Sequence, residues 1–283
     1  MPEIITEALM EMHFFHAQVR HFQRIFGANF IKLLKPSAHN EAWVGFDQGW
    51  VRTSLSTQEL FDDLKTAIQS KATSVNHFYL GYFLQFKIVR RLIRRSRHFP
   101  PHYSAPYLRS ELSLEANKTT GLSQHETLLR LSGINHVVVS YACAMLFESD
   151  DIYKKPDLDL LRCVDISTSP TGWATNERHF ITFRTESDPS PLWCSDPIEG
   201  KALGFKEWAS LDSKIGPRKL TAEELLNIIE GVNEEIGGRG AKRQRGLFKQ
   251  SEFSARYLPE CFTIMEFEES LGDRRSIRKI RIP

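Results

Sequence analysis

Gln85 and Lys87 lie two residues apart in a segment that is otherwise almost entirely apolar and aromatic, residues 77–89 (HFYLGYFLQFKIV). Its richness in Tyr, Phe and Val favours a central buried strand. Side chains two residues apart on a strand share a face, roughly 7 Å from one another, so both polar groups point one way and Phe86 points the other way. Burying an amide beside an ammonium is costly unless another group pairs with them. A carboxylate on a neighbouring strand would meet that need.

Asp47 is the carboxylate that the sequence offers, within a second strand-like segment at residues 41–51 (EAWVGFDQGWV). An Asp, a Gln and a Lys that converge at the ends of two neighbouring strands would form a small site for a metal ion and water. The same three residues could instead form a buried Lys–Asp ion pair with a hydrogen-bonded Gln, because ion-pair networks produce similar clusters. The sequence alone leaves both interpretations open.

Helices and strands that could position these residues are predicted along the first half of the chain. Residues 6–26 form an amphipathic helix in this prediction, with Thr6 as its cap and Gly27 at its end. A second helix is predicted at 123–132, where Ser123 and Glu126 form a capping box. Further elements are a helix at 56–70 and strands at 29–34, 43–51, 77–89, 107–114 and 136–145.

The second half of the chain carries weaker signals, because prolines interrupt its short predicted strands at 161–168 and 179–186. Another helix is predicted at 221–232. We place a soft boundary near residue 150, with residues 1–150 as a core and residues 151–283 as an accessory region that packs on the core or stands apart. The whole pattern predicts a mixed α/β layer arrangement.

This order of elements, with Asp47 in VGFDQ and with Gln85 and Lys87 in LQFK, resembles the core of the PD-(D/E)xK nucleases, the restriction-endonuclease-like enzymes. It is most similar to the subset with Gln in place of the second acid, as in Mrr-type enzymes. The resemblance covers roughly residues 5–145, and Phe46 stands where the family has Pro. It implies a restriction-endonuclease-like mixed sheet flanked by helices, with an appended mixed α+β region after residue 150.

The resemblance also implies an activity, which is Mg²⁺-dependent (or Mn²⁺-dependent) hydrolysis of phosphodiester bonds in DNA. Asp47 and Gln85 would be metal ligands, and Lys87 would orient the attacking water or stabilise developing charge. Gln85 lowers the negative charge of the site, so we expect weaker metal affinity than in an acid-rich site. The family also places a Glu on the first helix, for which Glu7 and Glu11 are candidates, and Glu41 is a third.

Basic residues follow the central strand and recur near the end of the chain. Phosphates carry most sequence-independent affinity for nucleic acids, so these residues are candidate contacts to DNA. Those after the strand recur at helical spacing, and the alternative is a solvated helix face. The candidates are Arg90, Arg91, Arg94, Arg95 and Arg97, and in the loop RGAKRQR Lys242, Arg243 and Arg245.

Composition sets broad limits on the kind of protein. The 283 residues are 41% hydrophobic and 25% charged with a net charge of +2, which is ordinary globular composition. The sequence contains no run of 18 apolar residues, so no membrane span is predicted. The start of the chain is acidic and does not resemble a signal peptide. The four cysteines lack CxxC spacing and fit a reducing compartment, so a cytoplasmic location is expected.

Three functions remain open from the sequence. The first is a metal-dependent nuclease that acts on DNA as a restriction or antiviral-defence effector. It could act as a homodimer, and a second protein could supply its targeting or activation. The second is a non-catalytic module for nucleic-acid binding or complex assembly that retains the nuclease fold. The third is an unrelated α/β protein in which Asp47 and Lys87 merely pair. Fold analogy alone is a weak guide among them.

Overall fold

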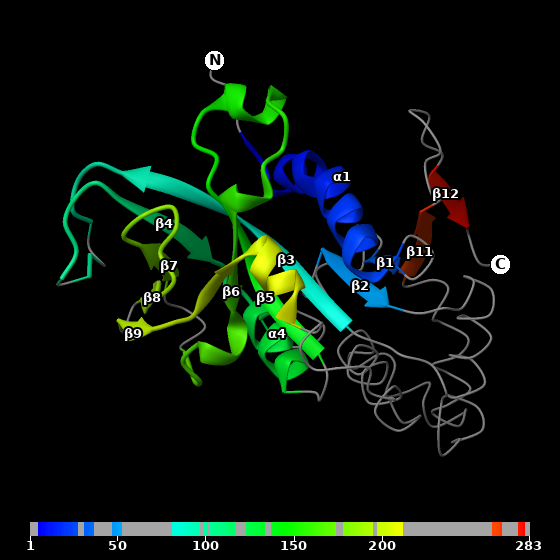
Figure 1. Cartoon of the computed structure of the whole chain (residues 1–283). Coiled ribbons are helices and arrows are strands. Elements are labelled where there is room, and N and C mark those ends of the chain that lie inside the picture. Colours follow the sequence, from blue (N-terminus) through cyan, green and yellow to red (C-terminus); the bar gives the residue numbers. More distant parts are fainter. Residues whose placement is uncertain are drawn as a thin grey trace, which may run out of the picture.

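A mixed β-sheet runs through the computed structural model, and helices cover it on both faces (Figure 1). The structure describes residues 5–27, 31–36, 47–52, 81–96, 99–100, 102–116, 123–133, 137–173, 178–194, 197–211, 262–267 and 277–280. Within these residues, the hydrogen-bonded strand order is β12-β11-β1-β2-β3-β4-β7-β8-β9, and β5, β6 and β10 branch from β3. The predicted α/β class is confirmed.

The strands come from both halves of the chain. Before residue 150 they are β1 (Ile31–Pro36), β2 (Gln48–Arg52), β3 (Gly81–Leu92), β4 (Tyr107–Leu112) and β5 (Val137–Ala144). After it they are β6 (Leu161–Asp165), β7 (His179–Phe183), β8 (Leu192–Cys194), β9 (Ile198–Glu199), β10 (Ala202–Gly204), β11 (Phe262–Phe267) and β12 (Ile277–Ile280). Because β6 pairs with β5, β7 with β4 and β11 with β1, residues on both sides of position 150 build the same sheet.

β3 is the strand on which the sheet is organised. Its first part pairs antiparallel with β2, and residues 81–88 pair in parallel with β5. Its last part, Val89 to Leu92, pairs antiparallel with β4 and opens a second sheet with β7, β8 and β9. Parallel strands need a crossover between them, and α4 (Gln124–Ser132) lies in the one from β3 to β5.

Both predicted helix starts before residue 150 that the structure describes are confirmed. In α1 (Glu7–Phe26), the Thr6 side chain accepts a hydrogen bond from the backbone of Leu9, and Gly27 ends the helix with a φ of 88°. In α4 the capping box of Ser123 and Glu126 is complete. The remaining helices of the described residues are α5 (Phe205–Ala209) and the 3₁₀ turns η2 (Ser149–Tyr153), η3 (Leu158–Leu160) and η4 (Ile166–Thr168).

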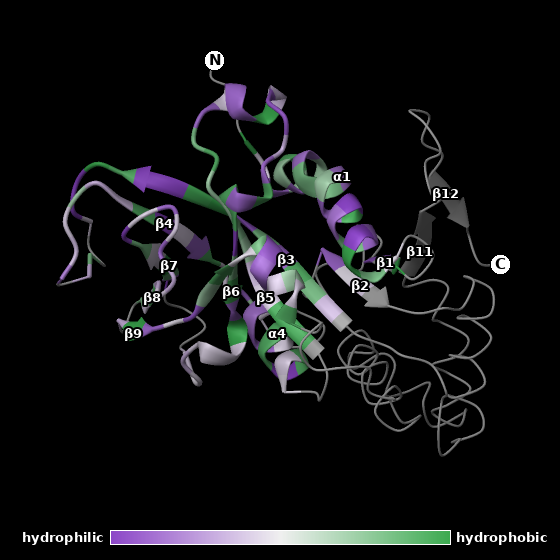
Figure 2. Cartoon of the chain, viewed as in Figure 1, coloured by the Kyte–Doolittle hydropathy of each residue, from purple (hydrophilic) through white to green (hydrophobic). Residues whose placement is uncertain are grey.

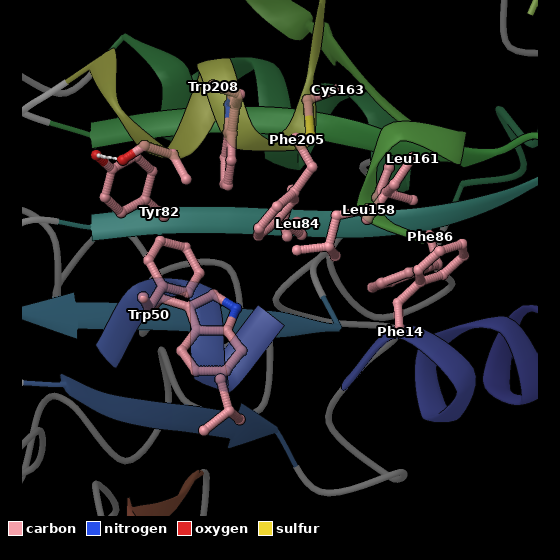
Figure 3. Close-up of a cluster of buried hydrophobic side chains, with 14 of the residues drawn as sticks. Phe14, Trp50, Tyr82, Leu84, Phe86, Leu158, Leu161, Cys163, Phe205 and Trp208 are labelled. Carbon is pink, nitrogen blue, oxygen red and sulfur yellow. Dashed lines mark hydrogen bonds between the residues drawn. The ribbon is translucent and has the colours of Figure 1, made fainter. Parts of the chain in front are cut away.

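Apolar side chains fill the space on each side of the sheet. On one side α1 and α5 cover β2 and β3, where Trp50 lies beside Tyr82 and Phe14 beside Phe86 (Figure 3). On the other side α4 and the second sheet enclose Phe83 and its neighbours. Figure 2 shows that α1 alternates hydrophobic and hydrophilic residues, as its packing against the sheet requires. The core thus holds β3 between two apolar layers.

The structure changes the prediction for residues 90–95. Their arginines recur at helical spacing, but Arg90 and Arg91 belong to β3, which continues to Leu92 because residues 89–92 pair with β4. The end of β3 is accordingly hydrophilic in Figure 2. Long-range pairing with residues 107–110 therefore overrides the local pattern. The predicted helices at 56–70 and 221–232 lie outside the described residues.

Two findings concern the expected lack of a membrane span and the state of the cysteines. None of the helices in the described ranges is long and apolar enough to cross a membrane. Cys143, Cys163 and Cys194 are buried and carry free thiols.

Gln18 is an anomaly in the core, since it is fully buried on α1 one turn from both Phe14 and Phe22. Neither its amide nitrogen nor its amide oxygen has a hydrogen-bond partner in the described part of the chain. A buried amide without partners costs about 1–3 kcal/mol. We expect Gln18→Met to raise the free energy of unfolding by about 1–2 kcal/mol in urea denaturation, because Met fills the same space without that cost.

The matched control is Gln23→Met, on the same helix but only half-buried. It is expected to change stability by less than about 0.5 kcal/mol. A loss of stability in Gln18→Met would show that the amide makes an interaction in solution that stabilises the fold.

Candidate active site

Asp47 lies directly before β2, where the antiparallel register brings it beside β3. Its backbone N–H donates to the carbonyl of Leu84 at 2.8 Å. Its carboxylate oxygen Oδ2 accepts from the backbone N–H of Phe86, also at 2.8 Å. Phe86 is the residue between Gln85 and Lys87, so the carboxylate is held at the part of β3 that carries both polar side chains. No donor among the described residues contacts its other oxygen, Oδ1.

Gln85 and Lys87 share a face of β3, as their spacing predicts, and Gln124 at the start of α4 joins them. The Gln124 amide nitrogen donates to Gln85 Oε1 at 2.9 Å, and Lys87 Nζ lies 3.4 Å from Gln124 Oε1. Lys87 Nζ also forms an ion pair with Glu7 on α1, with a shortest distance of 3.1 Å. Lys87 is almost wholly buried, whereas 40% of the Glu7 side chain is exposed. The buried ammonium is therefore neutralised from the solvent side.

Glu11, one helical turn after Glu7, enters a second set of contacts. Both of its carboxylate oxygens accept from Lys35 Nζ of β1, at 2.8 and 2.9 Å. The side chain of Gln48 donates to Glu11 Oε1 at 3.0 Å. Lys35 Nζ also donates to the backbone carbonyl of Asp47 at 3.0 Å. α1, β1 and the start of β2 are thus connected around Asp47.

We call this assembly the polar junction. It consists of eight side chains from two helices and three strands and their margins, and it lies where α1 and α4 meet the start of β2 and the middle of β3. Its members are Glu7, Glu11, Lys35, Asp47, Gln48, Gln85, Lys87 and Gln124.

The electrostatics of the polar junction are unfavourable for a charged Asp47. Burial raises its pKa to about 7, and the hydrogen bond from Phe86 opposes that rise. Glu11 also raises the pKa of Asp47 by charge repulsion, whereas Lys35 and Lys87 lower it. Both lysines and one further carboxylate are thus close enough to act on Asp47. An added cation would favour the charged form of this carboxylate.

The residues of the polar junction fit a divalent cation such as Mg²⁺. Mg²⁺ takes oxygen ligands and binds through one or two carboxylates together with water and substrate phosphate. Asp47 supplies a desolvated carboxylate whose Oδ1 has no donor among the described residues, Glu11 is the carboxylate that acts on it, and Gln85 supplies an amide oxygen. No three His, Cys, Asp or Glu side chains among the described residues form a metal-binding group on their own. A cation here would therefore need the amide, water or substrate to complete its ligands.

Several members of the polar junction were not among the predicted site residues. Lys35, Gln48 and Gln124 carry no motif of their own, although Gln124 begins the helix predicted from its capping box. Of the predicted residues, both Glu7 and Glu11 reach the polar junction, each through a different lysine. Glu41 lies outside the described residues. The i,i+4 spacing of Glu7 and Glu11 was the signal that both could take part.

The predicted DNA-contacting residues within the described ranges fall into two groups. Arg91 pairs with Glu186 at 2.9 Å and lies over the Phe147 ring, and Arg95 lies over the Phe99 ring. Arg90 and Arg94 are exposed and have no ion pair within the described ranges. The other candidates, Arg97, Lys242, Arg243 and Arg245, lie outside those ranges.

Comparisons with known proteins add no assignment to this geometry. No protein-family model, no curated protein and no solved structure matches the chain.

Proposed function

We propose that the chain is a metal-dependent nuclease whose active site is the polar junction. The observation that carries the proposal is the placement of Asp47, whose carboxylate binds the backbone between Gln85 and Lys87. The order of elements supports it too: a helix, an antiparallel hairpin, a third strand with Gln and Lys, then, after the inserted strand β4, a helix and a parallel strand. This is the order that the resemblance to restriction-endonuclease-like enzymes implies.

In this proposal the residues divide the chemistry among them. A bound Mg²⁺ or Mn²⁺ supplies charge neutralisation at the phosphate and an activated water. Asp47 and Gln85 would hold the ion, and Glu11 is the helix carboxylate that acts on Asp47. Lys87, fixed by Glu7 and Gln124, presents its ammonium beside the ligands and stabilises negative charge on the reacting phosphate.

The direct test is incubation of the full chain with supercoiled plasmid DNA in Mg²⁺, in Mn²⁺ and in EDTA. The expected result is nicked and linear product with either metal and none with EDTA. Binding of DNA without metal-dependent cutting would overturn the nuclease proposal and favour the non-catalytic module. Glu7→Gln and Glu11→Gln, tested in parallel, identify the helix carboxylate, and we expect the larger loss of cleavage in Glu11→Gln.

Arg90 and Arg94 are proposed to contact DNA phosphates, because they are exposed and unpaired in the described part of the chain. We expect Arg90→Ala/Arg94→Ala to weaken binding to any duplex and to reduce the slope of log K against log salt by about 2. Fluorescence anisotropy with labelled duplex at several salt concentrations measures both quantities. Lys154→Ala, which changes an exposed cation already paired with Asp151, is the control and should leave the slope unchanged. An unchanged slope in the double variant would assign these arginines to a merely solvated surface.

A further inference from the structure

A cavity of about 550 Å³ opens between α1, the segment at residues 155–158 and α5, away from the polar junction. From α1 it is lined by Ala17, Arg20, His21 and Arg24, which recur at the i, i+3, i+4 and i+7 spacing of one helix face. Glu7 and Glu11 lie two to four turns earlier on the helix. Pockets of this volume accept ligands of the size of a nucleotide.

The charged side chains that line the cavity are mostly cationic. Arg20, Arg24, Lys155 and Lys206 are its cations, and Asp157 is its one carboxylate among the described residues. Asp157 is already engaged, because its Oδ1 accepts the backbone N–H of Asp159 at the start of η3. The cavity therefore has a strong excess of positive charge.

Most of this positive charge has no ion-pair partner in the part of the chain that the structure describes. Lys206 pairs with Asp159 at 2.7 Å, but Arg20, Arg24 and Lys155 form no ion pair within the described residues. A single basic residue in the last turn of a helix is explained by the helix dipole, and Arg24 occupies such a position. That explanation does not extend to Arg20 or to Lys155, which lies on another segment.

His21 lies in the cavity wall and is affected by the same positive charges. Its ring nitrogen Nε2 is buried and has no hydrogen-bond partner in the described part of the chain. Burial lowers the pKa of His21, and the charges of Lys206 and Arg24 lower it further, whereas a backbone hydrogen bond at Lys206 and the charge of Asp159 raise it. An anion bound in the cavity would favour the protonated ring of His21, whose Nε2–H would then have a partner.

We propose that this cavity binds a small phosphate-bearing molecule, with Arg20, Arg24 and Lys155 as the groups that hold its phosphates. Arginine and lysine are the side chains that bind phosphate oxygens most strongly, through charge-assisted hydrogen bonds. The cavity is walled by α1 and two further segments, and its volume suits a compact anion. The inference is independent of the proposed nuclease activity, because it concerns other residues and is read out by binding alone.

The test is isothermal titration of the full-length protein with inorganic phosphate, pyrophosphate and ATP in buffer free of divalent ions. We expect saturable binding of pyrophosphate or ATP, and a loss of at least tenfold in affinity in Arg20→Ala/Arg24→Ala. Lys155→Glu, which changes a different segment, should lose affinity to a similar degree. The preference between pyrophosphate and ATP tells whether the cavity recognises phosphates alone or a nucleoside as well.

Arg130→Ala/Arg178→Ala removes two exposed arginine charges that do not line the cavity and is the matched control. It should bind the probes as the wild type does. The proposal is overturned if none of the three probes binds, if Arg20→Ala/Arg24→Ala binds as tightly as the wild type, or if the control loses affinity equally. In a histidine-detected NMR titration, the ring signal of His21 should shift with pyrophosphate, and its failure to move while binding persists would place the anion at another site.

Discussion

Asp47→Asn is expected to stabilise the protein at pH 8 by on the order of 3 kcal/mol and to change its stability little near pH 4.5. The folded protein keeps the Asp47 proton until about pH 7, whereas an ordinary Asp releases it near 3.8. Stability of the wild type therefore falls as the pH rises between these values, and it stays low above them. Asn carries no charge to desolvate, and its amide oxygen can still accept from the backbone of Phe86.

Urea denaturation of both proteins at several pH values, in buffer free of divalent ions, measures the difference between them. Comparing the two proteins cancels the other groups that titrate in this range. Asp150→Asn, on the exposed η2 turn, is the matched control and should follow the wild type at every pH. If Asp47→Asn shows the same stability difference at pH 4.5 and pH 8, the carboxylate is already well solvated or well paired when charged.

Asp47→Asn should also abolish metal-dependent cleavage, so the same substitution is expected to raise stability and remove activity. A residue that destabilises the fold at working pH and yet performs no function would be replaced by Asn without loss. Sites that do chemistry commonly hold such unfavourable groups, since activity and stability compete for the same positions. A more stable but inactive Asp47→Asn would therefore separate the catalytic role of this carboxylate from any structural role.

Local patterns in the sequence were enough to predict the elements that present the polar junction. The capping residues Thr6 and Ser123 fix the starts of α1 and α4 through side-chain hydrogen bonds over three residues, which sequence spacing reveals directly. The period of two likewise predicted that Gln85 and Lys87 share a face, and both contact Gln124. Such features are local, so they survive any arrangement of the rest of the chain.

Features set by distant pairing could not be predicted in the same way. The lysine that neutralises each helix carboxylate is chosen by the packing of α1 against the sheet, so Lys35 was missed although Glu11 was considered. His125 near the start of α4 is buried and forms a hydrogen bond with the hydroxyl of Tyr141 at 2.9 Å, which the helix pattern does not predict. The face of α4 that meets β5 decides its environment, and no spacing within α4 specifies that partner.

Lys87→Met is expected to lower metal-dependent plasmid cleavage by at least about 100-fold while leaving the fold intact. Met keeps most of the buried volume of the lysine stem and removes the ammonium that would stabilise charge on the phosphate. The cost to stability should be small, because the abandoned partner Glu7 is substantially exposed and can be solvated. Melting temperature and cleavage rate, measured on the same preparation, test both parts.

The comparison with Lys154→Met shows why the location of Lys87 matters. Lys154 also pairs with an acid, at 2.7 Å from Asp151, but it lies on the surface and far from Asp47 in the sequence. Its substitution should change neither cleavage nor melting temperature appreciably. A Lys87→Met protein that cleaves at the wild-type rate would mean that Lys87 serves only to pair with Glu7 and Gln124. In that case Lys87 would belong to an ion-pair network, and Lys35 would be the one lysine of the polar junction left beside Asp47 to act on a phosphate.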